Sequence, residues 1–241
     1  MLSKKEIKDI QSLSHKKFRD ELKLFVAEGP KIVGELIELI PQQIEKIYAV
    51  KEWIESNQSH EVEMVEVSSI EHQRLSHLQT PNQVIAVIKK LPSTKPDASS
   101  FTLYLDTIQD PGNFGTIIRT ADWFGIKSIV CSPGCADVYN PKVVQSTMAS
   151  IARVNVYYDE NEEWLKGQAV PALAATLHGR SLYDRSKMKE GILIIGNESK
   201  GVRKEILRYA TEQITIPKRG EAESLNAAVA TGIILSHLLT F

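Results

Sequence analysis

Beyond residue 100, short runs of apolar residues alternate with segments in which apolar residues recur at helical spacing. Parallel strands need crossover connections of this kind. The alternation therefore predicts an α/β fold, with a mostly parallel sheet covered by helices on both faces. The predicted strands are Thr102–Asp106, Ser128–Cys131, Arg153–Tyr157, Ala172–Thr176, Ile192–Ile195 and Gln213–Ile216. The predicted helices are Phe114–Phe124, Pro141–Ser150, Glu160–Leu165, Val202–Tyr209 and the segment that ends the chain.

The first 91 residues form a separate unit in this prediction. A basic helix up to about residue 20 is followed by a small α/β arrangement of the usual size for a domain. Its predicted strands begin at Leu24, Ile47, Val62 and Val84, and its predicted helices at Ile32, Lys51 and Ile70. Residues 92–100 are rich in Pro and Ser and have no periodicity, which predicts a linker. We therefore expect a small domain over 1–91, a linker over 92–100 and a larger domain over 101–241.

No stretch of the sequence is suited to a membrane. The charged start, Met1–Lys8, lacks the apolar core of a signal peptide. No window offers the ~18 apolar residues that a spanning helix needs. Hydrophobic residues (42%) and charged residues (24%) occur in the ordinary proportions of globular proteins. We expect a cytoplasmic protein.

The two cysteines, Cys131 and Cys135, do not predict a metal site. Zinc takes about four ligands, and no second pair of Cys or His follows at a suitable spacing. We expect two buried or half-buried thiols and no metal.

The formal net charge of −1 argues mildly against a nucleic-acid partner, since phosphate neutralisation supplies most non-specific affinity. Positive charge is nevertheless clustered in residues 4–23 and 200–208. Such runs are usually solvated faces, but a local basic patch can bind RNA under a neutral total.

The chain ends in an unusual helix. A β-branched run, Ile214–Ile216, stops at Pro217, and a polar loop containing Gly220 follows. Ser224 stands where an N-cap belongs, ahead of a segment that is apolar almost all the way round. A helix without a polar face favours burial on all sides, so we expect other segments to surround it. The plain alternative is an ordinary α/β domain closed by a strand, a loop and a core helix.

A first candidate site follows the strand that ends at Asp106. The sequence predicts a turn at Asp110–Gly112 and a helix capped by Asn113. Arg119 is expected on the side of that helix opposite its apolar face. The structural alternative is a capping asparagine and a solvated arginine. The glycines do not form a dinucleotide-binding GxGxxG, and no Walker lysine is present.

A second candidate site lies where a buried strand ends at Gly196 and an acidic turn with Glu198 follows. In an open α/β sheet, ligands bind in the crevice at the carboxyl ends of the strands. The structural alternative for Glu198 is a first-turn acid that interacts with a helix dipole.

Three stretches, in this order, resemble the motifs of the SpoU-type (TrmH-type) RNA 2'-O-methyltransferases of the SPOUT superfamily. They are Asn-x-Gly-x-x-x-Arg-x-Ala from Asn113, Gly-x-Glu-x-x-Gly from Gly196, and Ile-Pro, a polar loop and Ser-Leu-Asn up to Asn226. Val26–Gly29 and Thr80–Val87 also resemble the small RNA-binding domain that these enzymes often carry. The sequence departs from the family pattern at Asn197, Ser199, Lys218, Ala227 and Ala228, which bears on the substrate more than on activity.

The resemblance implies a trefoil knot, in which the last strand, loop and helix pass through an earlier loop. It also implies a homodimer, and S-adenosylmethionine bound in a bent form in the knot, largely by backbone groups. By position, the residues expected to line that cofactor site are Thr176, Gly196, Ile216, Leu225 and Asn226.

The reaction that the resemblance implies is methyl transfer to a ribose 2'-hydroxyl in structured RNA, either ribosomal or transfer RNA. Arg119 is the residue that the family uses to activate the hydroxyl, and it is expected to face a cofactor held by the other subunit. Asn113, Glu198, Ser224 and Asn226 are expected to position the arginine and the loops. Two alternatives stay open: a non-catalytic RNA-binding or ribosome-assembly protein on the same fold, and a small-molecule α/β enzyme.

Overall fold

The computed structural model describes residues 2–57 and 62–239. Contacts between residues divide the chain into two compact units. One comprises Met1–Pro92 and Asp137–Ala152, and the other comprises Ser93–Ala136 and Arg153–Phe241. The segment Asp137–Ala152, which the sequence places in the larger domain, thus packs with the smaller one. Within the described ranges, no helix combines the length and the apolar character that crossing a bilayer requires.

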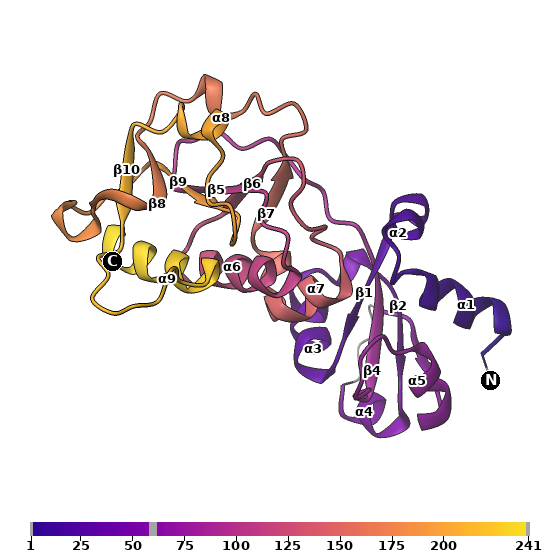
Figure 1. Ribbon diagram of the computed structural model, residues 1–241. Helices are drawn as coiled ribbons and strands as arrows, with labels where there is room; N and C mark the ends of the chain where they lie inside the picture. The colour runs from indigo at the N-terminus through magenta and orange to yellow at the C-terminus, as the bar shows by residue number, and fades with distance from the viewer. Residues whose placement is uncertain (1, 58–61, 240–241) are drawn as a thin grey trace. The chain divides into compact units, whose positions relative to one another are not determined.

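The larger unit is built on a six-stranded sheet in the order β10-β8-β9-β5-β6-β7 (Figure 1). Every pair of neighbouring strands in this sheet runs parallel, which confirms the predicted α/β fold. The strands are β5 (Thr102–Asp106), β6 (Ser128–Cys131), β7 (Asn155–Tyr158), β8 (Ala172–Ser181), β9 (Ile192–Gly196) and β10 (Glu212–Thr215). Since parallel strands end at the same edge of a sheet, the segments that follow β5 and β9 are neighbours.

Helices cover both faces of this sheet. α6 (Pro111–Trp123) and α9 (Ala227–Leu238) pack together on one face, and the short α8 (Lys204–Leu207) lies on the other (Figure 1). The prediction of a helix over Glu160–Leu165 is wrong. Glu162 adopts a left-handed backbone with φ +52°, so that only a 3-10 turn, η3 (Leu165–Gly167), forms nearby.

The start of α6 also differs from the prediction. The helix begins at Pro111, because the carboxylate of Asp110 caps it by accepting from the backbone N–H of Asn113 at 2.7 Å. Proline suits the first helical position, where a backbone N–H would have no intrahelical partner. Asn113 is therefore not the N-cap, and its side chain is available for a distant partner.

The start of α9 lies two residues beyond the predicted cap. The N-cap is Asn226, whose side-chain oxygen accepts from the backbone N–H groups of Ala228 at 2.9 Å and Val229 at 3.2 Å. The predicted N-cap, Ser224, lies exposed in the preceding loop. The prediction that the last helix is buried on all sides is also wrong for the single chain, because Val229 in α9 is 53% exposed.

The far end of α9 packs against the connection between β8 and β9. The backbone N–H of Met188 donates to the carbonyl of Leu238 at 2.7 Å, and Lys187 Nζ donates to the carbonyl of Ser236 at 3.1 Å. The last helix thus contacts an earlier connection, as a knot requires. The threading itself stays a prediction.

The smaller unit contains a four-stranded sheet in the order β1-β4-β2-β3, in which β4 is antiparallel to both neighbours. Its strands are β1 (Leu24–Glu28), β2 (Ile44–Ala49), β3 (Met64–Glu66) and β4 (Val84–Lys89). Its helices are α1 (Lys4–Ser12), α2 (Lys16–Leu22), α3 (Pro30–Leu39), α4 (Lys51–Ser56), α5 (Ser69–Leu75) and α7 (Pro141–Thr147). α7 comes from the segment between β6 and β7 and packs on β1.

The single basic helix predicted for the N-terminus is wrong, because α1 and α2 are separated by a turn at residues 13–15. The hydroxyl groups of Ser12 and Ser14 donate to backbone carbonyls three residues earlier, at 2.6 and 2.8 Å. Serine side chains that bond to the local backbone in this way favour turns over helix interiors. The turn folds α2 back, so that Arg19 can reach the carbonyls of Leu13 and Ser14.

Candidate functional site

The side chains of Asn113, Glu198 and Asn226 form a hydrogen-bonded row. Asn113 lies in the first turn of α6, Glu198 in the turn after β9, and Asn226 at the cap of α9. The amide nitrogen of Asn113 donates to Oε1 of Glu198 at 2.9 Å. Its amide oxygen accepts from the amide nitrogen of Asn226 at 2.7 Å. The structure therefore joins one residue from each of the three stretches that the sequence singled out.

A buried carboxylate at the end of β5, that of Asp106, binds residues from two later segments of the chain, Ser132 and Arg203. Asp106 has no exposed surface, and it accepts from the backbone N–H and from Nε of Arg203, each at 2.7 Å. Ser132 Oγ donates to the same carboxylate at 3.1 Å. Burial acts to lower the pKa of Arg203, but the hydrogen bonds and charges of Asp106 and Glu162 outweigh it and raise that pKa. The guanidinium therefore stays charged beside its two carboxylates.

Thr107 and Asn197 link the segments that follow β5 and β9. Thr107 has a left-handed backbone with φ +55°, which is costly for a β-branched residue. Its N–H donates to Ser132 Oγ at 2.9 Å, and its carbonyl accepts from the side chain of Asn197 at 2.8 Å. Asn197 also accepts from the backbone of Ser199 at 3.0 Å within the acidic turn. Strain of this kind persists only where the surroundings hold it in place.

Sequence reasoning missed Asp106, Ser132 and Arg203 and treated Asn197 only as a departure from a pattern. One signal was available, because a carboxylate directly after a buried apolar strand needs a partner. The partner itself was not identifiable, since Arg203 lies 97 positions away along the chain.

Arg119 lies on the exposed side of α6, whereas Ile117 and Ile118 on the same helix are buried. Its side chain makes no hydrogen bond or ion pair with any residue in the described ranges. A guanidinium offers five N–H donors in a planar fork that matches a phosphate or a carboxylate. Arg119 is thus available for a ligand.

Thr176, the first of the predicted cofactor-lining residues, has a buried hydroxyl with no hydrogen-bond partner among the described residues. It lies in an irregular stretch of β8. Pairing with β9 ends at Ala174, and the register against β10 jumps from Ala174 to Arg180. A buried hydroxyl without a partner is unfavourable, so a bound ligand with a polar edge would fit here.

The other predicted lining residues lie at the ends of β9 and β10 and just before α9. A Cβ atom at Gly196 would lie 2.2 Å from the backbone nitrogen of Val202, so the turn itself requires glycine. Ile216, after β10, is half-buried, and Leu225 is 49% exposed. The half-buried side chain of Ile216, the exposed side chain of Leu225 and the backbone groups at the strand ends suit a ligand with apolar and polar parts. Ser224 has no hydrogen bond to the row of Asn113, Glu198 and Asn226 in the part of the chain described.

The two cysteines are free thiols, with Cys131 buried and Cys135 half-buried. Burial raises the pKa of Cys131, which keeps it protonated and inert. Across residues 2–57 and 62–239, no three or more His, Cys, Asp or Glu side chains are grouped to hold a metal ion.

The fold and the site define an α/β protein with a candidate ligand site at the carboxyl ends of a parallel sheet, preceded in the chain by a small α/β domain. Residues 100–236 match the SpoU rRNA Methylase family, and residues 4–86 match the MRM3-like substrate binding domain. The chain belongs to the SpoU rRNA methylase family, as its three motifs predict.

Similarity to individual proteins extends over almost the whole chain. The 23S rRNA (guanosine(2553)-2'-O)-methyltransferase of Bacillus subtilis is 33% identical over 97% of this chain and 95% of its own length. A TrmH-family protein of Porphyromonas gingivalis has a TM-score of 0.90 and 36% identity, covering 99% of this chain and 98% of its own. An rRNA methyltransferase of Sinorhizobium meliloti, solved with AdoMet bound, has a TM-score of 0.84 and 30% identity over 98% of this chain and 95% of its own.

Proposed function

We propose that this protein is an S-adenosylmethionine-dependent methyltransferase that modifies a ribose 2'-hydroxyl in structured RNA. The observation that carries the proposal is the hydrogen-bonded row of Asn113, Glu198 and Asn226, which brings together the three stretches that resemble the family's motifs. A non-catalytic RNA-binding protein on this fold would need neither that row nor the unpartnered hydroxyl of Thr176.

S-adenosylmethionine, when bound, supplies a methyl group that its sulfonium makes electrophilic. The residues that would hold it are Thr176, Gly196, Ile216, Leu225 and Asn226. The hydroxyl of Thr176 would gain the hydrogen bond that it lacks, and Ile216 and Leu225 would provide apolar contact. Backbone groups beside Gly196 and Ile216 suit the polar edges of such a ligand. The AdoMet-bound relative, at 30% identity, supports S-adenosylmethionine as the cofactor.

Arg119 is proposed to act on the ribose. Arginine is always protonated in proteins and is therefore a poor general base. Its five donors can instead orient the 2'-hydroxyl, stabilise negative charge that develops on the oxygen, and hold the neighbouring phosphate. Asn113, Glu198 and Asn226 are positioning residues in this proposal, because they fix the starts of α6 and α9 and the acidic turn between them.

A homodimer is proposed for the active state, with Arg119 of one subunit facing the cofactor held by its partner. Two observations support it. Trp123, one helical turn after Arg119 on α6, is 85% exposed, and Val229 on the adjacent α9 is 53% exposed. Large apolar side chains exposed on two packed helices are typical of a surface that associates with a partner.

The smaller unit is proposed to bind the RNA, since residues 4–86 match a substrate binding domain. Its exposed lysines in α1 and α2, including Lys4, Lys8 and Lys17, would contact phosphates. Ribosomal RNA is the favoured substrate, because the full-length relative from Bacillus subtilis is named for 23S rRNA. With such a substrate, the protein is proposed to act in the cytoplasm.

The test uses purified protein, ribosomal RNA and labelled S-adenosylmethionine, with calorimetry of cofactor binding beside the methylation assay. Arg119→Ala should bind the cofactor normally and lose roughly a hundredfold in methylation rate. Arg208→Ala, which removes an exposed arginine elsewhere in the same unit, is the matched control and should behave like the wild type. Normal turnover by Arg119→Ala would remove Arg119 from the mechanism, and failure of the wild type to bind the cofactor would favour a binding protein.

A further inference from the structure

A cavity lies on the surface of the smaller unit, between α1, the end of α2 and the sheet. Its volume is ≈ 350 Å³, within the range of about 300–1,000 Å³ that sites for small molecules occupy. The residues that line it belong to α1 and its caps, to the last position of α2, and to strands β1, β2 and β4. All of them lie in the smaller unit, so that unit alone forms the cavity.

The floor of the cavity is apolar. Its buried members are Ile10, Leu13, Tyr48 and Val87. Leu24 is half-buried and Leu22 is 44% exposed, so the apolar surface continues from the floor to the solvent. Val87 lies opposite Lys46 in the antiparallel pair of β4 and β2, which places both side chains on the same face of the sheet. A flat apolar ring system on this floor would therefore have a lysine beside it.

The rim of the cavity carries hydrogen-bond acceptors. The carboxylate of Asp9 is exposed and makes no hydrogen bond or ion pair with any residue that the structure describes. Glu45 pairs with Lys89 at 3.1 Å, and both side chains stay about half exposed. The carboxylate of Glu6 instead accepts from Tyr48 Oη at 2.8 Å. Asp9 and Glu45 are thus accessible to the N–H groups of a ligand.

α2 presents an aromatic ring and positive charges beside the cavity. Phe18 is 38% exposed and lies four positions before Leu22, so the two side chains are neighbours on the helix. Lys17 Nζ lies 6.0 Å from the centroid of the Phe18 ring, and the side chain of Lys16 is 65% exposed. Aromatic rings beside lysines are typical of surfaces that bind single-stranded nucleic acid, because they stack on bases and contact phosphates. The match of residues 4–86 to a substrate binding domain agrees with RNA as the ligand.

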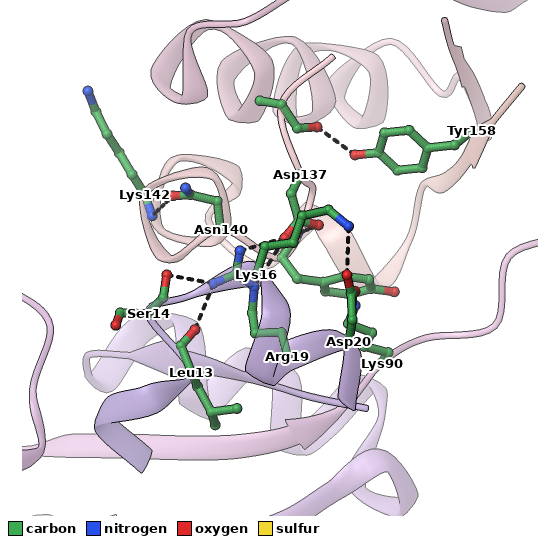
Figure 2. A network of polar contacts seen from close by, with 12 residues as sticks. Leu13, Ser14, Lys16, Arg19, Asp20, Lys90, Asp137, Asn140, Lys142 and Tyr158 are labelled. Carbon is green, nitrogen blue, oxygen red and sulfur yellow. Dashed lines mark hydrogen bonds and ion pairs between the residues drawn. The ribbon is translucent and has the colours of Figure 1, made fainter. Parts of the chain in front are cut away.

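A buried arginine holds α2 in place. Arg19 is 2% exposed, and its Nη1 donates to the carbonyls of Leu13 and Ser14 at 2.7 and 2.8 Å (Figure 2). Its Nε and Nη2 donate to Oδ2 of Asp137, which belongs to the same unit, at 3.1 and 2.6 Å. Leu13 is part of the cavity floor, so Arg19 fixes α2 against one of the residues that form it. A site held in this way loses little conformational entropy when a ligand binds.

We propose that this cavity binds an unpaired nucleobase of the RNA substrate, and that the base is one with an amino group: adenine, cytosine or guanine. The faces of the base contact the apolar floor and Leu22, its amino group donates to Asp9 or Glu45, and lysines of α2 contact the adjoining phosphates. A base inside an RNA duplex is stacked and paired, so it cannot enter. The inference rests on the proposed methyltransferase function, and it specifies that the substrate is single-stranded where the smaller unit binds.

Two short RNAs test the proposal on the full chain. One is an unstructured strand of alternating cytidine and adenosine, and the other is the same strand paired with its complement. Leu22→Gln makes the edge of the cavity polar without adding charge. In fluorescence anisotropy it should weaken binding of the single strand about tenfold and leave binding of the duplex unchanged. Leu39→Gln, at a leucine of α3 that is 39% exposed and does not line the cavity, is the matched control.

Wild-type affinity of Leu22→Gln for both RNAs would overturn the proposal. Equal weakening of both would also overturn it, because Leu22 would then serve the fold of α2. A third RNA, made of uridine only, should bind the wild type about tenfold more weakly than the strand with amino groups. The double variant Asp9→Ala and Glu45→Ala should lose this preference. Equal wild-type affinity for the two single strands, or a preference that survives in the double variant, would overturn the proposal.

Nuclear magnetic resonance locates the bound RNA without an activity assay. Titration with the cytidine–adenosine strand should shift the methyl signals of Leu22 and Leu24 and leave those of Leu39 in place. A shift that follows protein concentration alone would assign the cavity to a second copy of the chain and overturn the proposal. A protein that shows the RNA-dependent shifts but methylates no RNA would contradict the proposed function only. Methylation without these shifts would overturn the inference and leave the function intact.

Discussion

Asn113 donates its side-chain N–H to Glu198 across 85 positions of sequence, at 2.9 Å. The same amide group accepts from Asn226, so that a single neutral side chain stands between an acid and the cap of the last helix. An amide can donate to a carboxylate on one side and accept from another amide on the opposite side, which neither a carboxylate nor an ammonium group can do. The two hydrogen bonds therefore restrict which side chains can replace Asn113, although asparagine is itself a common residue.

The first prediction concerns Asn113→Asp, which replaces the donor with a carboxylate that faces Glu198. The two like charges repel, and the start of α6 separates from the acidic turn. Methylation should fall at least about tenfold, since a hydrogen bond to a charged group contributes about 1.5–3 kcal/mol. Steady-state kinetics measure this, with Asn113→Ala for comparison. Ala removes both bonds without adding a charge, so a loss in Asn113→Ala as large as that in Asn113→Asp would show that repulsion has no part.

The second prediction concerns Asp106→Asn. The substituted amide would present N–H donors to Arg203, which itself only donates. Because Arg203 is partly exposed, the expected cost is about 1–3 kcal/mol of unfolding free energy rather than that of a fully buried pair. Urea unfolding measures it, and methylation should fall as well, because the acidic turn loses its anchor. Asp97→Asn, which alters an exposed turn in the same unit, should leave both quantities unchanged.

The third prediction concerns acid stability of the smaller unit. Burial acts to raise the pKa of Glu28, but hydrogen bonds from His77 and Ser76 outweigh it and hold the pKa below its ordinary 4.5. A lowered pKa means that the charged form stabilises the folded state above about pH 4.5, and that this contribution is lost as the pH falls further.

Glu28→Gln should therefore lower stability at pH 7 by about 1–3 kcal/mol and flatten the decline of stability below pH 4.5. Thermal unfolding followed from pH 7 downward measures both effects. Glu38→Gln, at an exposed position of α3, is the control. An equally steep acid decline in Glu28→Gln would assign the acid sensitivity to other groups.

The fourth prediction concerns the proposed dimer. Trp123→Lys and Val229→Lys each place a charge on the exposed apolar surface of α6 and α9, where burial against a partner would be unfavourable. Sedimentation should show a shift from dimer to monomer in both variants. Phe18→Lys, which alters a partly exposed aromatic residue of the smaller unit, should not dissociate the dimer. A wild type that sediments as a monomer would contradict the dimer itself.

Much of the larger sheet was predictable from the sequence. Thr102–Asp106 and Ser128–Cys131 agree with the structure residue for residue, because each is a compact apolar run that is buried in the sheet. β8 was predicted too short, since it continues past an irregular stretch up to Ser181. Gly179 allows this, because a Cβ atom there would lie 2.5 Å from the backbone of Gln213. Such a close approach leaves no periodic pattern in the sequence.

The helix caps and the polar contacts of the site were less predictable. Asp110 and Asn113 both cap helices well, and they lie three positions apart. Glu198, in a turn that is distant in the sequence, accepts a hydrogen bond from the side chain of Asn113, and Asp110 is the residue that caps α6. The pair of Asp106 and Arg203 likewise depends on the sheet having formed. Such partners are set by tertiary structure, which a local pattern does not contain.

The passage of Asp137–Ala152 into the smaller unit bears on how proteins of this architecture can be recombined. A fragment cut after Pro92 would remove α7 from β1 and expose Phe25, which is fully buried in the intact chain. Exchange of the RNA-recognition module between two relatives would have to replace the α7 segment together with the N-terminal residues. In a chimaera made with a single fusion point, Arg19 would come from one parent, and the segment that contains its hydrogen-bond partner Asp137 would come from the other.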